Sequence, residues 1–212
     1  MSYCRSTVAV MLVMILMGPV TTLADDGEVA ALRERWETIT TDMPDDARGQ
    51  AYAELVEEAT QLVESSPDDA DALLWKGIAL ASEARAKGGP GALGLAKEAR
   101  DDLERVVELD PSGGNASAYV TLAVLYQRVP GWPLGFGDSD TAEALFQSAR
   151  QIRPEGIDVN YYYAVFLEEE GRVDDALEHA RLAVEGESRE GRTASDEALR
   201  DDAWKLIDRL SS

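Results

Sequence analysis

Hydrophobic residues recur along this 212-residue chain with a period near 3.6, and no stretch alternates convincingly with a period of two. Such periodicity is typical of amphipathic helices, so the sequence predicts an all-α fold. The expected helical faces lie in residues 29–39, 52–63, 73–80, 99–106, 119–126, 142–149, 161–167, 176–183 and 199–210.

The helical pattern repeats. Three prolines each close an amphipathic stretch, with spacings of 44 and 43 residues, and a small residue follows each proline after ten or twelve positions. An internal period in this range indicates stacked helix pairs, in which no unit buries its apolar face alone. We expect a helix pair at 25–66, three repeats at 67–190 and a capping helix at 191–212. The prolines are Pro67, Pro111 and Pro154, and the small residues are Gly77, Ala123 and Ala164.

The expected second helices carry a fixed set of residue types. These are Ala99, Leu103, Val106 and Pro111, then Ala142, Phe146, Ala149 and Pro154, then Ala176, Ala180 and Ala183 with Ser188 in place of proline. Over about residues 45–190 the chain therefore resembles tetratricopeptide repeat (TPR) proteins. The resemblance implies a superhelix of stacked antiparallel helix pairs and a protein- or peptide-binding function.

Two segments exceed the repeat length, near residues 85–97 and 128–139, and both look like segments of exported bacterial repeat proteins. More distantly, the plan looks like the T-component of TRAP transporters, which implies a solute-binding protein as partner. The letters of Gly89–Gly94 fit a dinucleotide fingerprint, but they follow a helix and not a strand, so we expect no cofactor. In the second segment, Trp132, Leu134 and Phe136 either extend the core, which we favour, or edge a ligand site.

Helix starts carry local signals. The run Asp140-Thr-Ala-Glu143 fits a capping box, which predicts that Asp140 caps the sixth helix and that Glu143 reaches back to it.

The first helix of each pair lines the concave side of such a superhelix. The residues expected there are apolar along the middle and charged at the edges, a pattern that suits an extended peptide or a helix. The alternative is that several of them pack against a neighbouring helix. They are Asp71, Leu74, Ile78, Ser117, Val120, Val124, Gln127, Arg128, Asp158, Tyr161, Val165 and Glu168.

The first residues predict export. Arg5 is the only charged residue before Asp25, the stretch 8–20 is apolar, and Thr22-Leu-Ala24 offers small residues for cleavage, so residues 1–24 read as a signal peptide. Cleavage would remove Cys4 and leave no cysteine. We expect a periplasmic or secreted protein with no membrane insertion after cleavage.

Charge narrows the classes of partner. The chain has 41 acidic and 20 basic residues and a formal net charge of −21, which disfavours nucleic acids and anionic lipid surfaces. His179 is the only histidine, and we expect it at a boundary or facing solvent, so a catalytic triad and a histidine metal cluster are excluded. We expect no metal, no cofactor and no enzymatic activity.

Together these patterns predict a non-enzymatic exported scaffold that binds a protein or peptide in its concave groove. The alternative is a small-molecule-binding accessory of a periplasmic transporter, in which the Trp132 segment closes an apolar pocket.

Overall fold

A computed structural model describes residues 26–212, so the predicted signal peptide and Cys4 lie outside the described residues. The described chain is all-helical, as the periodicity predicts, and its helices are α1 (Asp26–Asp42), α2 (Asp45–Ser65), α3 (Ala70–Lys87), α4 (Gly89–Leu109), α5 (Ser117–Arg128), α6 (Ser139–Ile152), α7 (Ile157–Glu169), α8 (Val173–Glu185) and α9 (Thr193–Leu210).

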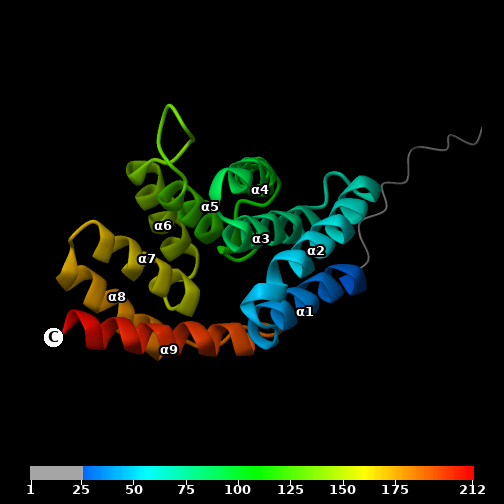
Figure 1. Ribbon diagram of the computed structural model, residues 1–212. Coiled ribbons are helices and arrows are strands. Elements are labelled where there is room, and N and C mark those ends of the chain that lie inside the picture. Colours follow the sequence, from blue (N-terminus) through cyan, green and yellow to red (C-terminus); the bar gives the residue numbers. More distant parts are fainter. Residues whose placement is uncertain (1–25) are drawn as a thin grey trace, which may run out of the picture.

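The helices stack as successive pairs, and each pair is antiparallel (Figure 1). The last helix, α9, packs on both α7 and α8, and it also touches α1. In Figure 1 the start of α9 lies beside the end of α1 along the lower side of the molecule. The two ends of the described superhelix therefore meet.

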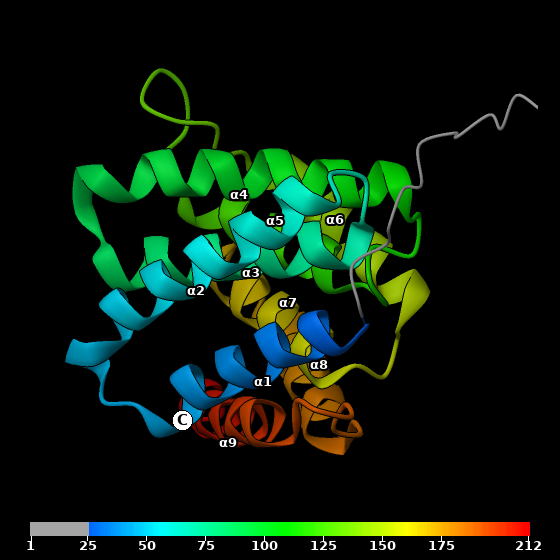
Figure 2. The ribbon, with the colours of Figure 1, turned by 90° about the vertical axis from the view of Figure 1, so that its right-hand side faces the viewer.

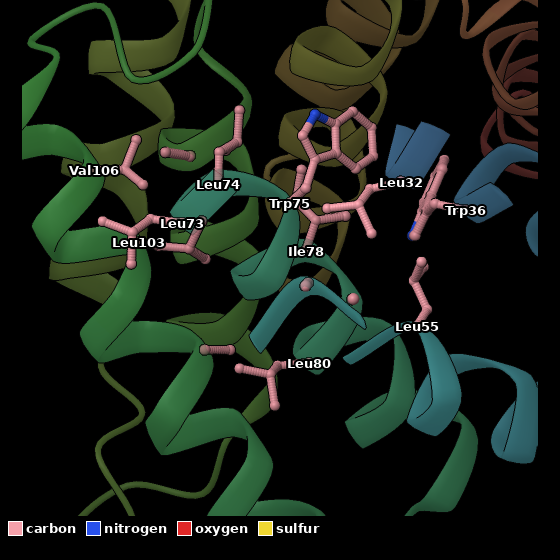
Figure 3. Packing of buried hydrophobic residues seen from close by; sticks show 14 of the residues in the cluster. Leu32, Trp36, Leu55, Leu73, Leu74, Trp75, Ile78, Leu80, Leu103 and Val106 are labelled. Atoms are coloured by element: carbon pink, nitrogen blue, oxygen red, sulfur yellow. The ribbon is translucent and has the colours of Figure 1, made fainter. Parts of the chain in front are cut away.

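Close helix packing explains the predicted small residues. A Cβ at Gly77 of α3 would lie 2.7 Å from Leu103 Cγ of α4, closer than real contacts allow. Ala123 and Ala164, at the equivalent places, are fully buried. Figure 3 shows Leu73 of α3 beside Leu103, and Trp36 of α1 on the other side of α3. Small residues therefore lie where these helices pack most closely.

The extra residues near 85–97 lengthen helices instead of forming a loop. Helix α3 continues to Lys87, the chain bends at Gly88 with φ +59°, and α4 begins at Gly89 with Pro90 in its first turn. Proline fits there because the first helical amides have no partner within the helix. Figure 2 shows α4 as the long green helix lying alongside α3.

The cap of α6 differs from the prediction. Asp138, not Asp140, precedes the helix, and its carboxylate accepts a 2.7 Å hydrogen bond from Thr141 N. The amide of Asp138 donates to Tyr126 O, which fixes where the chain enters the helix. No capping box forms, because Glu143 instead accepts from Arg172 and from the Tyr163 hydroxyl.

The turn between α4 and α5 is left-handed over four consecutive residues, 113–116, whose φ values are +56°, +57°, +54° and +72°. Asp110 holds this turn, because its carboxylate accepts hydrogen bonds from Ser112 and from the amide of Gly114 at 2.8 Å. The Gly114 amide lowers the pKa of Asp110, so the carboxylate stays charged and the turn stays closed.

Candidate functional site

The middle of the predicted groove is packed rather than open. Leu74, Ile78 and Val120, which the sequence places on the groove, are each only about 5% exposed or less. Leu74 and Ile78 belong to the largest apolar cluster, and Val120 packs with Ala116 and Val159. These three side chains are therefore part of the packed interior and offer no surface to a ligand, which is the alternative left open by the sequence.

The other predicted groove residues are more accessible, and they include Asp71 at the start of α3 and Arg128 at the end of α5. Asp71 and Arg128 are exposed, and Val124, Gln127, Tyr161, Val165 and Glu168 are half-buried. Contacts tie these helices together: Gln127 donates to Glu169 at 2.7 Å, Arg128 lies 3.2 Å from the same carboxylate, and Arg209 of α9 pairs with Glu168 at 2.8 Å. Burial, with the nearby Asp202 carboxylate, raises the pKa of Tyr161 to about 12. What remains accessible is a rim along α5, α7 and α9.

Asp158 and Ser117, also predicted on the concave side, contact Arg189, which is not among the predicted groove residues. Arg189 Nη1 lies 2.8 Å from Asp158 Oδ2 and donates to Ser117 Oγ at 3.5 Å. The same guanidinium pairs with Asp196 at 2.5 Å, and Arg153 holds the other oxygen of Asp158. Burial alone would raise the pKa of Asp158, but the arginines around it outweigh burial and lower that pKa.

A second arginine fills the space between α1 and α3. The guanidinium carbon of Arg192 lies 4.3 Å from the ring centroid of Trp36 and 5.5 Å from that of Trp75. The two rings are 6.0 Å apart and tilted by 60°. Glu37 supplies the opposite charge at 4.0 Å and also accepts the amide of Ser195 at the start of α9. Burial lowers the pKa of Arg192 to about 10, so it remains charged at neutral pH.

Sequence periodicity could not reveal these arginines. They lie between α8 and α9, in residues 186–192. This stretch has no apolar residue, and such a pattern predicts a solvated linker. The only available signal was the pair of tryptophans, Trp36 and Trp75, which the pattern assigns simply to the core.

The segment between α5 and α6 forms a loop that projects at the top of Figures 1 and 2. Trp132 is 89% exposed and Leu134 is 71% exposed, so the favoured interpretation that they extend the core is wrong. Phe136 does fold back, since its ring lies 5.2 Å from that of Tyr126 and 4.7 Å from the guanidinium of Arg100. The loop is closed at its base by the Gly137 amide, which donates to Pro130 O at 3.0 Å.

The two long segments meet in space. A Cβ at Gly135 would lie 3.4 Å from Leu93 Cδ1 of α4, and Arg100 of the same helix covers Phe136. Residues 88–96 and 129–137 contain no charged residue, in a chain that is 29% charged. We call these two segments together the uncharged surface. Its exposed large apolar side chains are Trp132 and Leu134, on a protein whose formal net charge is −21.

His179 is buried, contrary to the expectation of a boundary or solvent-facing position. Its ring packs edge-on against Tyr163 at 4.7 Å, and its Nδ1 lies 2.9 Å from Asn160 Oδ1. Because Asn160 Nδ2 already donates to Pro154 O and Gly156 O, we assign the proton of this contact to His179 Nδ1. Burial and the positive charge of Arg150 lower the pKa of His179 to about 4.

Because His179 is buried and uncharged, we expect the stability of the fold to decrease in acid. The pKa of His179 is about 4 in the folded protein and 6.5 in the unfolded chain, so between these pH values only the unfolded chain binds the proton. The free energy of unfolding therefore falls as pH falls. We expect the free energy of unfolding to drop by about 2 kcal/mol from pH 7 to pH 5. Urea titrations at both pH values test this, with His179→Gln as the comparison. An equal drop in both proteins would assign the effect to other groups.

Other candidate chemistry is sparse within residues 26–212. That part of the chain holds no group of three or more histidine, cysteine or acidic residues placed to bind a metal. It also contains no helix that combines the length and the apolarity needed to cross a bilayer. Two shallow depressions of about 350 and 370 Å³ flank α1, one beside α2 and one beside Gly191 and Ala194.

Comparisons with known proteins agree with this architecture. Residues 134–185, which include the whole of α6, α7 and α8, match the tetratricopeptide repeat family. No curated protein shows significant sequence similarity to the chain. Among solved structures, TTC0263, a thermophilic TPR protein of Thermus thermophilus, superposes with a TM-score of 0.56 at 18% identity, covering 77% of this chain and 79% of that protein. MamA gives a TM-score of 0.48 at 17% identity, with 76% and 87% covered. The chain has a TPR-like helical-repeat fold.

Proposed function

We propose that this chain is a non-enzymatic scaffold that binds a partner protein, and that the uncharged surface makes the first contact. A TPR-like fold suggests a protein-interaction scaffold, because stacked helix pairs present extended rigid surfaces. The observation that carries the proposal is the exposure of Trp132 and Leu134 at the tip of a closed loop.

Exposure of the Trp132 ring to water is unfavourable unless a partner covers the ring. A soluble protein rarely keeps a contiguous apolar patch without a binding role, and tryptophan is the residue most enriched at energetic centres of interfaces. The hydrogen bonds that close the loop hold Trp132 and Leu134 outward before binding, which reduces the entropy lost on association. The partner surface that fits is an apolar pocket.

This proposal does not assign the partner contact to the predicted concave groove. Its central residues are buried, and its interior is occupied by Arg189 and Arg192 of the same chain. No observation on the described residues favours the transporter-accessory alternative.

We expect a Trp132→Ala protein to fold normally and to lose its partner. Because the side chain is 89% exposed, the free energy of unfolding should change by less than about 0.5 kcal/mol. Affinity for a partner captured from the native host, and then purified, should fall at least about tenfold. The measurement is a titration of the purified pair beside a thermal melt.

The matched control is Trp204→Ala, which removes a 52% exposed tryptophan from α9 and should leave the affinity unchanged. A partner that is retained by Trp132→Ala but lost with Tyr161→Ala would move the contact to the concave rim and refute the assignment.

We also propose export to the periplasm or beyond, on the basis of the leader pattern in residues 1–24. N-terminal sequencing of the protein from fractionated host cells tests it, and a mature form that begins at Asp25 is the expected result. Recovery of the intact chain from the cytoplasm would contradict it.

A further inference from the structure

The connector between α8 and α9, residues 186–192, runs along the concave side. Its second half forms a turn, in which the Arg192 amide donates to Arg189 O at 3.1 Å and Gly191 has φ +70°. Glu187 forms an isolated parallel β-bridge with Gly156 before α7. Gly186 lies so close to the same turn that a Cβ there would be 2.6 Å from Glu155 O. The connector thus docks by its backbone at one end, in the manner of an added strand.

Two arginine side chains, three residues apart, anchor the connector. Arg189 enters between Asp158 of α7 and Ser117 of α5, and Arg192 enters between Trp36 of α1 and Trp75 of α3. Because these partners belong to four separate helices of the superhelix, the site is built by the fold and not by the connector. Aromatic rings with a nearby carboxylate are a general means of holding a guanidinium.

The second of these sites is incompletely satisfied. Within the described chain, Arg192 Nε and Glu37 Oε2 have no hydrogen-bond partner, although both are buried, and 4.0 Å separates them. A depression of about 370 Å³, lined by Glu37, Gly191 and Thr193 among others, lies beside this junction. A buried charge without full hydrogen bonding is costly, so the connector is held less firmly at Arg192 than at Arg189.

We propose that the concave side is a binding site for arginine-bearing protein segments that form the same turn, and that the connector occupies it in cis until such a segment displaces it. The partner segment presents two arginines at a three-residue spacing, like Arg189 and Arg192. The net charge of −21 favours the approach of a basic partner. This site is separate from the uncharged surface, so either assignment can fail alone.

A labelled peptide with the sequence of residues 186–192 tests the site in trans. Tethering gives the connector a high effective concentration, so the full wild-type chain should bind the peptide weakly. The Arg192→Ala chain, whose cage is vacated, should bind it at least about tenfold more tightly. Arg181→Ala, which removes an exposed arginine of α8, is the matched control and should behave like wild type. A peptide in which both arginines are alanine should not bind either chain.

Equal binding to the wild-type and Arg192→Ala chains, or no binding to a folded Arg192→Ala chain, would overturn the proposal. If that variant does not fold, hydrogen exchange on the wild-type chain decides. Excess peptide should speed exchange of the Arg189 and Ser195 amides, which now donate to Asp196 and Glu37. Unchanged exchange at a peptide concentration of several millimolar would also refute displacement.

Discussion

An Asp158→Asn protein is expected to lose about 3 to 5 kcal/mol of its free energy of unfolding, the usual cost of removing one partner from a buried ion pair. Asp158 is 4% exposed and lies between Arg153 and Arg189. Asparagine keeps the shape of the side chain but leaves excess positive charge in the interior. Arg189 retains Asp196, whereas Arg153 loses the only ion-pair partner described for it.

Urea denaturation at pH 7 measures this effect, and Asp68→Asn is the control. Asp68 forms an equally direct 2.9 Å pair with Arg105, but on the surface, where such pairs contribute at most about 1 kcal/mol. If both variants lost the same small amount, the interior network would not be what holds α5, α7 and the connector together.

Most of the fold follows from periodicity. Helices bury one stripe of residues, so the 3.6-residue pattern is sufficient to place each of them, and close approach requires small residues such as Gly77 and Ala123. The second helices keep the expected set, with Phe146 and Ala149 fully buried. These features are local, and a local pattern is what a single sequence records well.

The functional surfaces depend on contacts between distant residues. Nothing local indicates that Arg192 reaches Trp36, because 156 positions separate them and the connector has no apolar residue. Curvature, which brings α9 to α1, is set by the sum of small rotations between pairs and decides whether a groove is open. The prediction that Trp132 extends the core is wrong because it rests on a local property, since apolar side chains are normally buried.

Gly114→Ala is expected to destabilise the protein by about 2 to 4 kcal/mol, because two costs add. Gly114 has φ +57°, where a Cβ crowds the following carbonyl. The new Cβ would also lie 2.3 Å from Cδ2 of Leu74, a buried side chain that has little room to move. Displacing this turn would weaken its hydrogen bond to Asp110 as well.

A substitution at a second glycine is the control for the general effect of adding a methyl group. Gly94 lies inside α4 on an exposed position, and a Cβ there meets no atom within 4 Å. Gly94→Ala should therefore stabilise the protein by about 0.5 to 1 kcal/mol, since alanine has the higher helix propensity. Thermal melts of the two variants should shift in opposite directions. A Gly114→Ala protein that melts with the wild type would show that the left-handed turn and its contact with Leu74 do not constrain the packing of α3 against α5.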